Sequence, residues 1–279
     1  MGDLGKDTAV QGGDGQYTCM LSRDWEIWGP MGGYVAAVAL RAAGAHSRFD
    51  RPASLVGHFL GVAAFDEVQL TTTTRRAASR AESIAVSMTQ GGKPIFDALV
   101  WTVAPGVAGL DHDKSHLGDD IGPPEHYPTV AEHLARIGER PNPPFPFWNN
   151  FESRPLEWID NWEDREPSDP VWESWERYVV EPDPSDLFLC AARLLLLVDV
   201  GSWPAVTRLH VDNKGLYAPS LDLACQFHRI APGVAPLLVR GESPSGAEGL
   251  LGTHQQVWSP DRELLASGVS QLLCRPASQ

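Results

Sequence analysis

Residues 186–200 read DLFLCAARLLLLVDV, a run that would be apolar on nearly every face of a helix. A helix without a polar face is normally buried inside a protein. Pro184 and Ser185 precede the run, so we expect the helix to begin there, with Ser185 as the N-cap and Asp186 in the first turn. The sequence therefore predicts a central, buried helix in the second half of the chain.

A similar run lies in the first half, where residues 31–46 read MGGYVAAVALRAAGAH. Its small side chains allow other elements to approach the helix backbone closely. After each predicted helix come several segments with strand character, separated by turn signals rather than by further helices. This repeated order indicates a duplicated unit of one helix and an antiparallel sheet.

The expected strands follow from alternating apolar residues bounded by turn residues, with Gly91 and Gly92 turning one pair. They lie near Ser54–Gly61, Glu67–Arg75, Ser83–Gln90 and Pro94–Val103 in the first half, and near Thr207–Val211, Ser220–His228, Pro236–Glu242, Leu250–Trp258 and Glu263–Cys274 in the second.

A length of 279 residues favours two domains of ordinary size. The segment from Pro105 to Pro146 contains eight prolines, which is typical of an ordered or flexible linker. We therefore predict an N-terminal unit over residues 1–104, a Pro-rich linker over 105–150 and a C-terminal unit over 151–279.

The formal net charge of −14 argues against a nucleic-acid partner, because no basic patch offsets repulsion from phosphates. Much of this charge lies between Phe151 and Asp183, where eleven acidic residues face three arginines. The same segment contains four tryptophans. We expect a solvated surface strand region anchored by tryptophan, and not a binding site for a charged partner.

The N-terminus has no apolar run typical of a signal peptide, and no stretch approaches the length that spans a bilayer. We expect a cytoplasmic protein with no membrane partner. Cys19, Cys190, Cys225 and Cys274 are far apart and mostly within apolar runs, so small buried side chains are expected and not disulfides or zinc ligands. Phosphate loops, dinucleotide fingerprints and zinc signatures are missing from the sequence, so we expect no cofactor and no metal.

Asp199 is the catalytic candidate that its surroundings indicate most directly. It lies within LLLLVDVGSW, where a carboxylate must be desolvated or find a partner, and near a helix C-terminus, where the dipole disfavours negative charge. Both effects raise the pKa of a carboxyl group, which suits a general base. The alternative is an aspartate that reaches solvent or caps the turn at Gly201.

Other candidates have weaker signals. Ser220 begins an apolar alternating run, where its hydroxyl can orient a water or satisfy a strand end. Gly32 and Gly33 leave helix N–H groups open to an oxyanion or a phosphate, or only allow close packing. His228, at a strand end, favours a structural interpretation, and the His-rich loop over 111–116 a solvated one, because no distant metal ligand is implied.

Several short motifs, taken in order, resemble the acyl-CoA thioesterase II family, whose members are double hotdog proteins. They are Met31–Tyr34, His58–Leu60, Ser79–Arg80 and Gly92–Phe96, then Asp199 with Pro204, Ser220–Asp222, Phe227–Arg229, and Ala266–Ser267 with Arg275. The resemblance covers most of both halves. It implies an α+β fold of tandem hotdog units, each an antiparallel sheet wrapped around a central helix, with acyl-CoA bound between the halves.

The resemblance also implies a thioesterase of lipid metabolism that hydrolyses acyl-CoA without a covalent intermediate, using an Asp, a Ser or Thr, and a Gln to hold water. Asp199 and Ser220 fall at the first two positions. Ser270 falls at the third, and Gln271 lies one residue later. Successive strand residues face opposite sides, so Gln271 is the third catalytic candidate on the condition that a bulge turns it inward.

Three functions follow from these residues. In the leading hypothesis the protein hydrolyses acyl-CoA, with the N–H groups of Gly32 and Gly33 on the oxyanion and Trp203 against the acyl chain. The displaced glutamine motivates the second, a non-catalytic acyl-binding module. The third, a hotdog hydratase, requires a His five residues after the Asp, where this chain has Pro204. A homodimer is compatible with all three.

Overall fold

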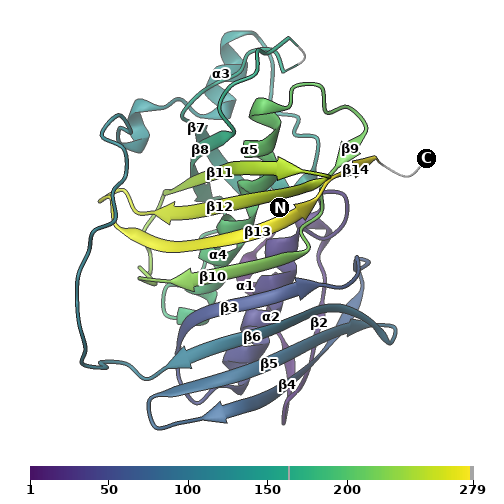
Figure 1. Cartoon of the computed structure of the whole chain (residues 1–279), viewed down its shortest axis with the longest axis vertical. Helices are drawn as coiled ribbons and strands as arrows, with labels where there is room; N and C mark the ends of the chain where they lie inside the picture. The colour runs from purple at the N-terminus through teal and green to yellow at the C-terminus, as the bar shows by residue number, and fades with distance from the viewer. Residues whose placement is uncertain (163, 277–279) are drawn as a thin grey trace.

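One large antiparallel sheet dominates the computed structural model, which describes residues 1–162 and 164–276 (Figure 1). The strands of the first half are β1 (Gln11–Gly13), β2 (Gln16–Met20), β3 (Arg51–Phe59), β4 (Glu67–Ala77), β5 (Ala81–Gln90) and β6 (Lys93–Val103). Those of the second half are β7 (Phe151–Pro155), β8 (Val171–Tyr178), β9 (Leu216–Tyr217), β10 (Asp222–Phe227), β11 (Leu237–Ala247), β12 (Leu250–Trp258), β13 (Leu264–Leu273) and β14 (Arg275–Pro276).

The two halves contribute six strands each to this sheet, in the order β1-β2-β4-β5-β6-β3-β10-β13-β12-β11-β8-β7, while β14 and β9 form a separate pair. The halves join where β3 pairs with β10, from Ser54 opposite Gln226 to His58 opposite Asp222. The repeat predicted from the sequence is thus one continuous sheet built from two similar sets of strands.

Two long helices, α2 (Gly32–His46) and α4 (Leu187–Val200), pack side by side against one face of this sheet (Figure 1). They run antiparallel: a Cβ added to Gly33 would lie 2.9 Å from the Cα atom of Leu196, and one added to Gly44 would lie 2.5 Å from the ring of Phe188. The start of each helix therefore meets the end of the other. The shorter helices are α1 (Leu4–Asp7), α3 (Val130–Arg136), α5 (Ser202–Leu209), and the 3-10 turns η1 (Arg23–Trp25), η2 (Pro124–His126) and η3 (Pro146–Asn150).

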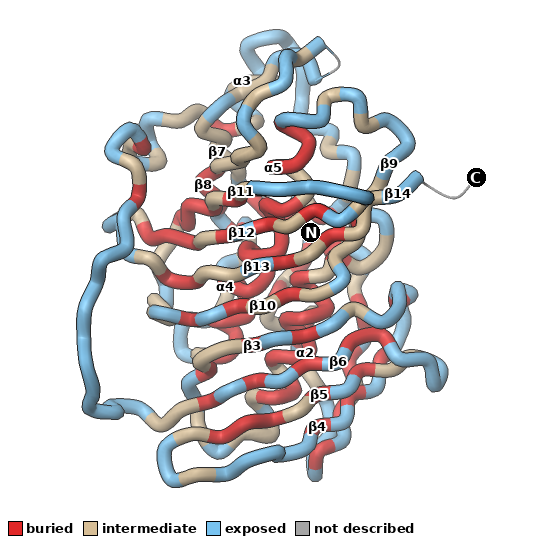
Figure 2. The backbone as a smooth tube through the Cα atoms, viewed as in Figure 1, coloured by how far each residue is buried: buried red, intermediate tan, exposed pale blue. Residues whose placement is uncertain are grey.

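Both long helices are buried, as the sequence predicted (Figure 2). Residues 36–40 of α2 and 194–198 of α4 have no exposed surface. Burying each large aliphatic side chain contributes about 1.5–3 kcal/mol, so residues 194–198 alone contribute on the order of 10 kcal/mol before the entropy cost. The net free energy of unfolding of a typical domain is of the same size, so loss of the burial of this one segment would be enough to unfold the protein.

Several local predictions were wrong. Asp186, and not Ser185, caps α4, because its Oδ1 accepts the Leu189 N–H at 2.9 Å. Asp186 also forms an ion pair with Arg41, which closes the end of the helix pair that lies beside Phe188. The strand expected near Thr207–Val211 is instead the end of helix α5 and the loop after it, because the chain continues helically from Ser202 to Leu209 with its apolar side toward the core.

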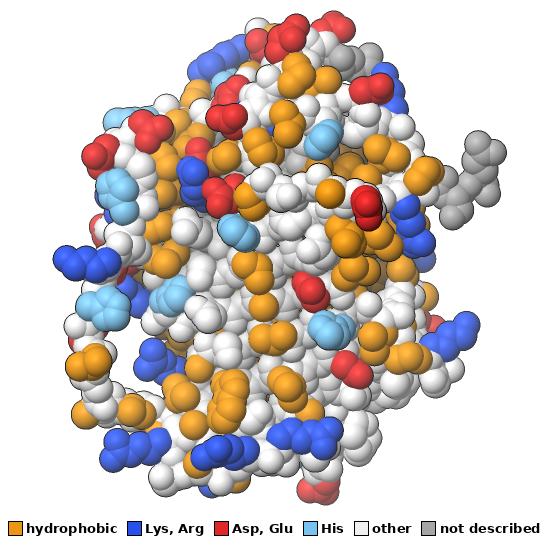
Figure 3. All heavy atoms as spheres, viewed as in Figure 1, with side chains coloured by type: hydrophobic (Ala, Val, Ile, Leu, Met, Phe, Trp, Pro, Cys, Tyr) orange, Lys and Arg blue, Asp and Glu red, His pale blue; other side chains and the backbone are white. Residues whose placement is uncertain are grey.

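Acidic side chains are exposed at the end of the molecule where α3 lies (Figure 3), but the acidic segment is not uniformly a solvated surface. Its strand β8 buries the side chains of Trp175 and Glu176, which are 2% and 1% exposed. Trp175 packs with Leu238 and Trp258 in a satellite cluster on the outer side of the sheet. The sequence missed this burial because the surrounding charges conceal the alternation of the strand.

The run Leu187–Leu209 has 23 residues, and the mean hydropathy of its most apolar window is 1.6, so by length and composition it could cross a membrane. The prediction that no stretch approaches this length was therefore wrong. Burial inside the structure covers 83% of its most apolar window, so these residues are core of the protein.

We expect the C-terminal half to be unable to fold alone. Residues of α2 and α4 share one core cluster, and removal of residues 1–150 would expose the face of α4 that packs on α2. Expression of residues 151–279 should give an insoluble or non-cooperative fragment, as measured by thermal unfolding and circular dichroism. A soluble fragment with a sharp transition would show that the two halves have independent cores.

Candidate active site

Asp199 occupies the last turn of α4, next to the start of α2, and its side chain is 8% exposed. Its Oδ2 accepts a hydrogen bond from the Gly33 N–H at 2.7 Å. The first N–H groups of a helix have no partner within the helix. Met31, the N-cap of α2, offers no side-chain hydrogen bond, so Asp199 supplies from another helix the acceptor that a capping residue normally provides.

Glycine is required at both positions beside this carboxylate. A Cβ on Gly32 would lie 2.8 Å from Asp199 Oδ2, and one on Gly33 would lie within 3.0 Å of both Leu196 and Asp199. Contacts this short would push the two helices apart. The Gly32–Gly33 pair therefore sets the distance at which the carboxylate meets the helix terminus.

Ser220 approaches the same carboxylate from the opposite side. It precedes β10 and is bridged to Leu272 of β13, and its Oγ donates to Asp199 Oδ1 at 3.2 Å. Each carboxylate oxygen thus has one fixed donor and retains a lone pair for a further donor. Asp199 and Ser220, both predicted from the sequence, are brought together.

Burial raises the pKa of the Asp199 carboxyl from 3.8 to about 6, while the hydrogen bonds from Gly33 and Ser220 pull it down. Desolvation disfavours the charged form, and donors favour it. A carboxyl that titrates near pH 6 is largely ionised at neutral pH and still basic enough to accept a proton. This balance is the one required of a general base.

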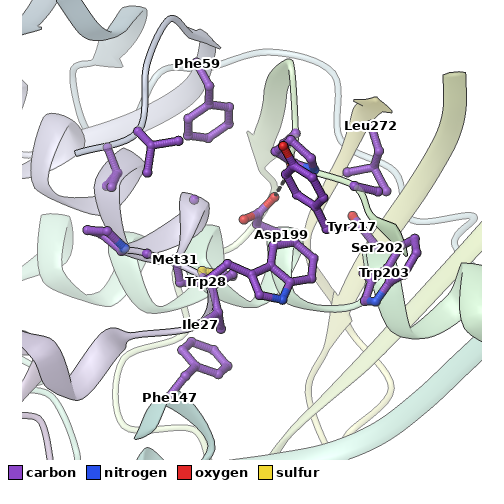
Figure 4. A pocket seen from close by; sticks show the side chains of 18 of the residues that line it. Ile27, Trp28, Met31, Phe59, Phe147, Asp199, Ser202, Trp203, Tyr217 and Leu272 are labelled. Atoms are coloured by element: carbon purple, nitrogen blue, oxygen red, sulfur yellow. Dashed lines mark hydrogen bonds between the residues drawn. The ribbon is translucent and has the colours of Figure 1, made fainter. Parts of the chain in front are cut away.

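Asp199 faces a mostly apolar pocket of about 320 Å³ between the two halves (Figure 4). Ser220 lines the same pocket. Trp203, predicted as a substrate contact, lines it, as does Gly32. Trp28 reaches from the first half and places its ring 6.2 Å from that of Trp203 and 5.9 Å from that of Tyr217. Aromatic walls around one carboxylate suit an acyl group attached to a reactive carbonyl carbon.

Some wall residues were missed by sequence reasoning. Phe145, Phe147 and Trp148 line the pocket although they lie in the predicted linker, and Phe147 is 1% exposed. The Phe147 N–H donates to the Glu26 carbonyl at 3.1 Å, which ties this segment to the first half. The cluster of aromatic residues after Pro144 could have indicated a buried segment. The surrounding prolines led to the prediction of a linker instead.

Gln271 is not brought to the pocket. The pairing of β13 with β12 is regular from Ala266 to Leu273, so the bulge that would turn Gln271 inward does not occur in this described segment. Its neighbours Ser270 and Leu272 are buried, and Leu272 lines the pocket, which places Gln271 on the opposite face. Ser270 donates its hydroxyl to the Asp222 carbonyl at 2.6 Å.

The histidine candidates lie elsewhere. His228 is exposed and hydrogen-bonds Ser267 across the sheet surface at 2.8 Å. In the loop over 111–116, Asp113 accepts from Arg229 at 2.9 Å. Among residues 1–162 and 164–276, no three His, Cys, Asp or Glu side chains are grouped as metal ligands.

A sheet of this order, two antiparallel core helices and a buried carboxylate between them define a double hotdog protein. The chain matches the acyl-CoA thioesterase N-terminal domain over residues 21–103 and the acyl-CoA thioesterase C-terminal domain over residues 124–274. It therefore belongs to the acyl-CoA thioesterase family, and the resemblance seen in the sequence is confirmed.

Solved structures support the same fold. A hotdog protein of unknown function from Alicyclobacillus acidocaldarius is 19% identical, with a TM-score of 0.79 over 99% of this chain and 98% of that one. The acyl-CoA thioesterase II TesB2 of Mycobacterium marinum is 21% identical, with a TM-score of 0.77 over 99% of each chain. The dehydratase domain of PpsC from Mycobacterium tuberculosis is more distant, at 11% identity and a TM-score of 0.53 over 96% of this chain and 97% of that one. A search of curated proteins gave no match.

The raised pKa of Asp199 predicts a stability cost at neutral pH. Because the folded-state pKa of about 6 exceeds the ordinary value of 3.8, the contribution of Asp199 to stability is fully present below about pH 4 and is lost as the pH rises through 6. Asp199→Asn keeps the acceptor for Gly33 and removes the titration. We expect this variant to be more stable than the wild type at pH 8 by on the order of 2–3 kcal/mol, and equally stable near pH 4. Urea unfolding at both pH values measures this, and a difference independent of pH would contradict it.

Proposed function

We propose that the protein hydrolyses an acyl-CoA thioester to a free acid and CoA. The observation that carries this proposal is the buried Asp199 carboxylate, held by Gly33 and Ser220 and facing an apolar pocket between the halves. Membership of the acyl-CoA thioesterase family supports the choice of substrate.

In the proposed reaction Asp199 accepts a proton from water as the water oxygen bonds to the thioester carbon. The carbonyl electrons move onto oxygen and form a tetrahedral oxyanion. When this intermediate collapses, the carbon–sulfur bond breaks, and the leaving thiolate takes the proton from Asp199. Atoms and charge balance without a covalent enzyme intermediate.

The oxyanion requires hydrogen-bond donors, and only one of the two N–H groups expected from the sequence is free to act as one. The Gly33 N–H is already engaged by Asp199 and is not open to substrate. The Gly32 N–H has no hydrogen-bond partner among the described residues and lies at the pocket wall. We assign the oxyanion to Gly32, while Gly33 positions the base.

A non-catalytic acyl-binding module is the second candidate, favoured by the turned-away Gln271 alone. A hydratase has no supporting observation, because the residue five positions after Asp199 is Pro204. The domain boundaries, the cytoplasmic location and a homodimeric state remain predictions from the sequence.

Asp199→Asn should reduce release of free thiol by about 10²- to 10⁴-fold, the usual contribution of a general base. Because the base must be ionised, wild-type kcat/KM should fall as the pH drops through about 6 and reach a plateau above it. A continuous thiol assay on a panel of acyl-CoA esters measures both. Wild-type turnover with an undiminished Asp199→Asn variant would refute the mechanism, and no turnover by the wild type would favour the binding module.

Gln271→Ala should leave turnover within about threefold of wild type, since the side chain lies on the face of β13 away from the pocket. Its backbone N–H, which donates to Asp222 Oδ1 at 2.9 Å, is kept in the variant. The same thiol assay applies. A loss comparable to that of Asp199→Asn would mean that the strand turns during catalysis.

A further inference from the structure

Ser202 is a polar residue of the pocket that the family resemblance does not use. It begins α5, three residues after Asp199, and is 2% exposed. Asp199, Ser202 and Ser220 line the same pocket, and Figure 4 shows Ser202 on the α5 side of Asp199. These three are the small polar side chains among the described residues that form its wall.

A buried chain of hydrogen bonds runs behind Ser202. Thr253 Oγ1 lies 3.0 Å from the Ser270 carbonyl, to which it donates, and 3.1 Å from Ser202 Oγ, a contact in which either hydroxyl can be the donor. When the Thr253 proton is on the Ser270 carbonyl, Ser202 donates to Thr253, and the Ser202 proton points away from the pocket. Gln255 donates from Nε2 to Ser202 Oγ at 3.3 Å and occupies one of the two lone pairs of that oxygen. The other lone pair remains available as an acceptor.

This network is not explained by stability. Thr253 and Gln255 are each 1% exposed, and Gln255 Oε1 is buried without a hydrogen-bond partner among the described residues. An unpartnered buried polar atom costs about 1–3 kcal/mol. An apolar residue at position 255 would avoid that cost, but it would also release the orientation of Ser202.

We propose that Ser202 holds the attacking water by accepting one of its hydrogen atoms while Asp199 accepts the other. A water with both O–H bonds directed to fixed acceptors presents a lone pair to the thioester carbon. Ser202 thereby takes over water binding from Ser270, whose hydroxyl is engaged by the Asp222 carbonyl, and from Gln271, which faces away. This inference rests on the proposed hydrolysis.

Ser202→Ala tests the proposal in the full chain. We expect kcat for thiol release to fall by on the order of 10²-fold with KM changed less than about twofold, because the water and not the acyl-CoA is misplaced. Hydroxylamine, which attacks a thioester without a base removing its proton first, serves as a second nucleophile. After subtraction of the hydroxamate that forms without enzyme, the ratio of hydroxamate to free acid should rise at least tenfold in Ser202→Ala relative to wild type.

Two further variants complete the experiment. Ser243→Ala is the matched control, since Ser243 is also buried, donates to the Gly252 carbonyl at 3.1 Å and lies outside the pocket lining. It should change neither kcat nor the product ratio. Thr253→Val removes the acceptor for the Ser202 proton and should shift the ratio in the same direction as Ser202→Ala.

The outcomes separate the two proposals. Wild-type turnover together with an unaffected Ser202→Ala variant would overturn the role of Ser202 and leave the proposed function standing. A loss in which hydroxamate and acid fall equally would show a structural role and would also overturn it. If the wild type releases no thiol from any acyl-CoA, the proposed function fails and the assignment of Ser202 fails with it.

Discussion

The hydrogen bond from the Gly33 N–H to Asp199 Oδ2 is the contact on which the rest of the structure depends. It joins the unsatisfied start of one core helix to the end of the other, so one carboxylate completes a helix terminus and is also the base of the proposed reaction. Burial alone would favour a neutral carboxyl. The amide and the Ser220 hydroxyl restore enough stability to the charged form that the pKa settles near 6.

The continuous sheet fixes the relative position of the two helices that this contact requires. Because β3 and β10 are paired, the two helices cannot slide relative to each other without breaking the ladder between the halves. The pocket then takes one wall from each half and a third from residues 145–148. A bound acyl group would thus contact three segments far apart in the sequence, none of which forms a site alone.

Much of this was readable from sequence because it depends on local patterns. A run such as 194–198, without a polar face, must be buried wherever it lies, and a carboxylate at its end must be paired or desolvated. The cap at Asp186 was missed because the neighbouring Ser185 is an equally good N-cap residue. Helix α5 was missed because the short apolar segment within it also fits the pattern of a strand. The role of Ser202 could not be predicted, because the partners of its hydroxyl, Thr253 and Gln255, are 51 and 53 residues away in the sequence.

The two ends of the helix pair have diverged in character. Two identical units related by a two-fold axis would have to present the same residues at both ends, whereas a single chain carrying both units does not. At one end lies the Asp199 carboxylate, and at the other the ring of Phe188 fills the space over Gly44 beside the Arg41–Asp186 ion pair. In the fused chain one end of the helix pair can therefore carry the candidate site while the other end only holds the helices together. Substitutions that adapt the pocket to an acyl group can accumulate at the first end without weakening the packing and the ion pair at the second.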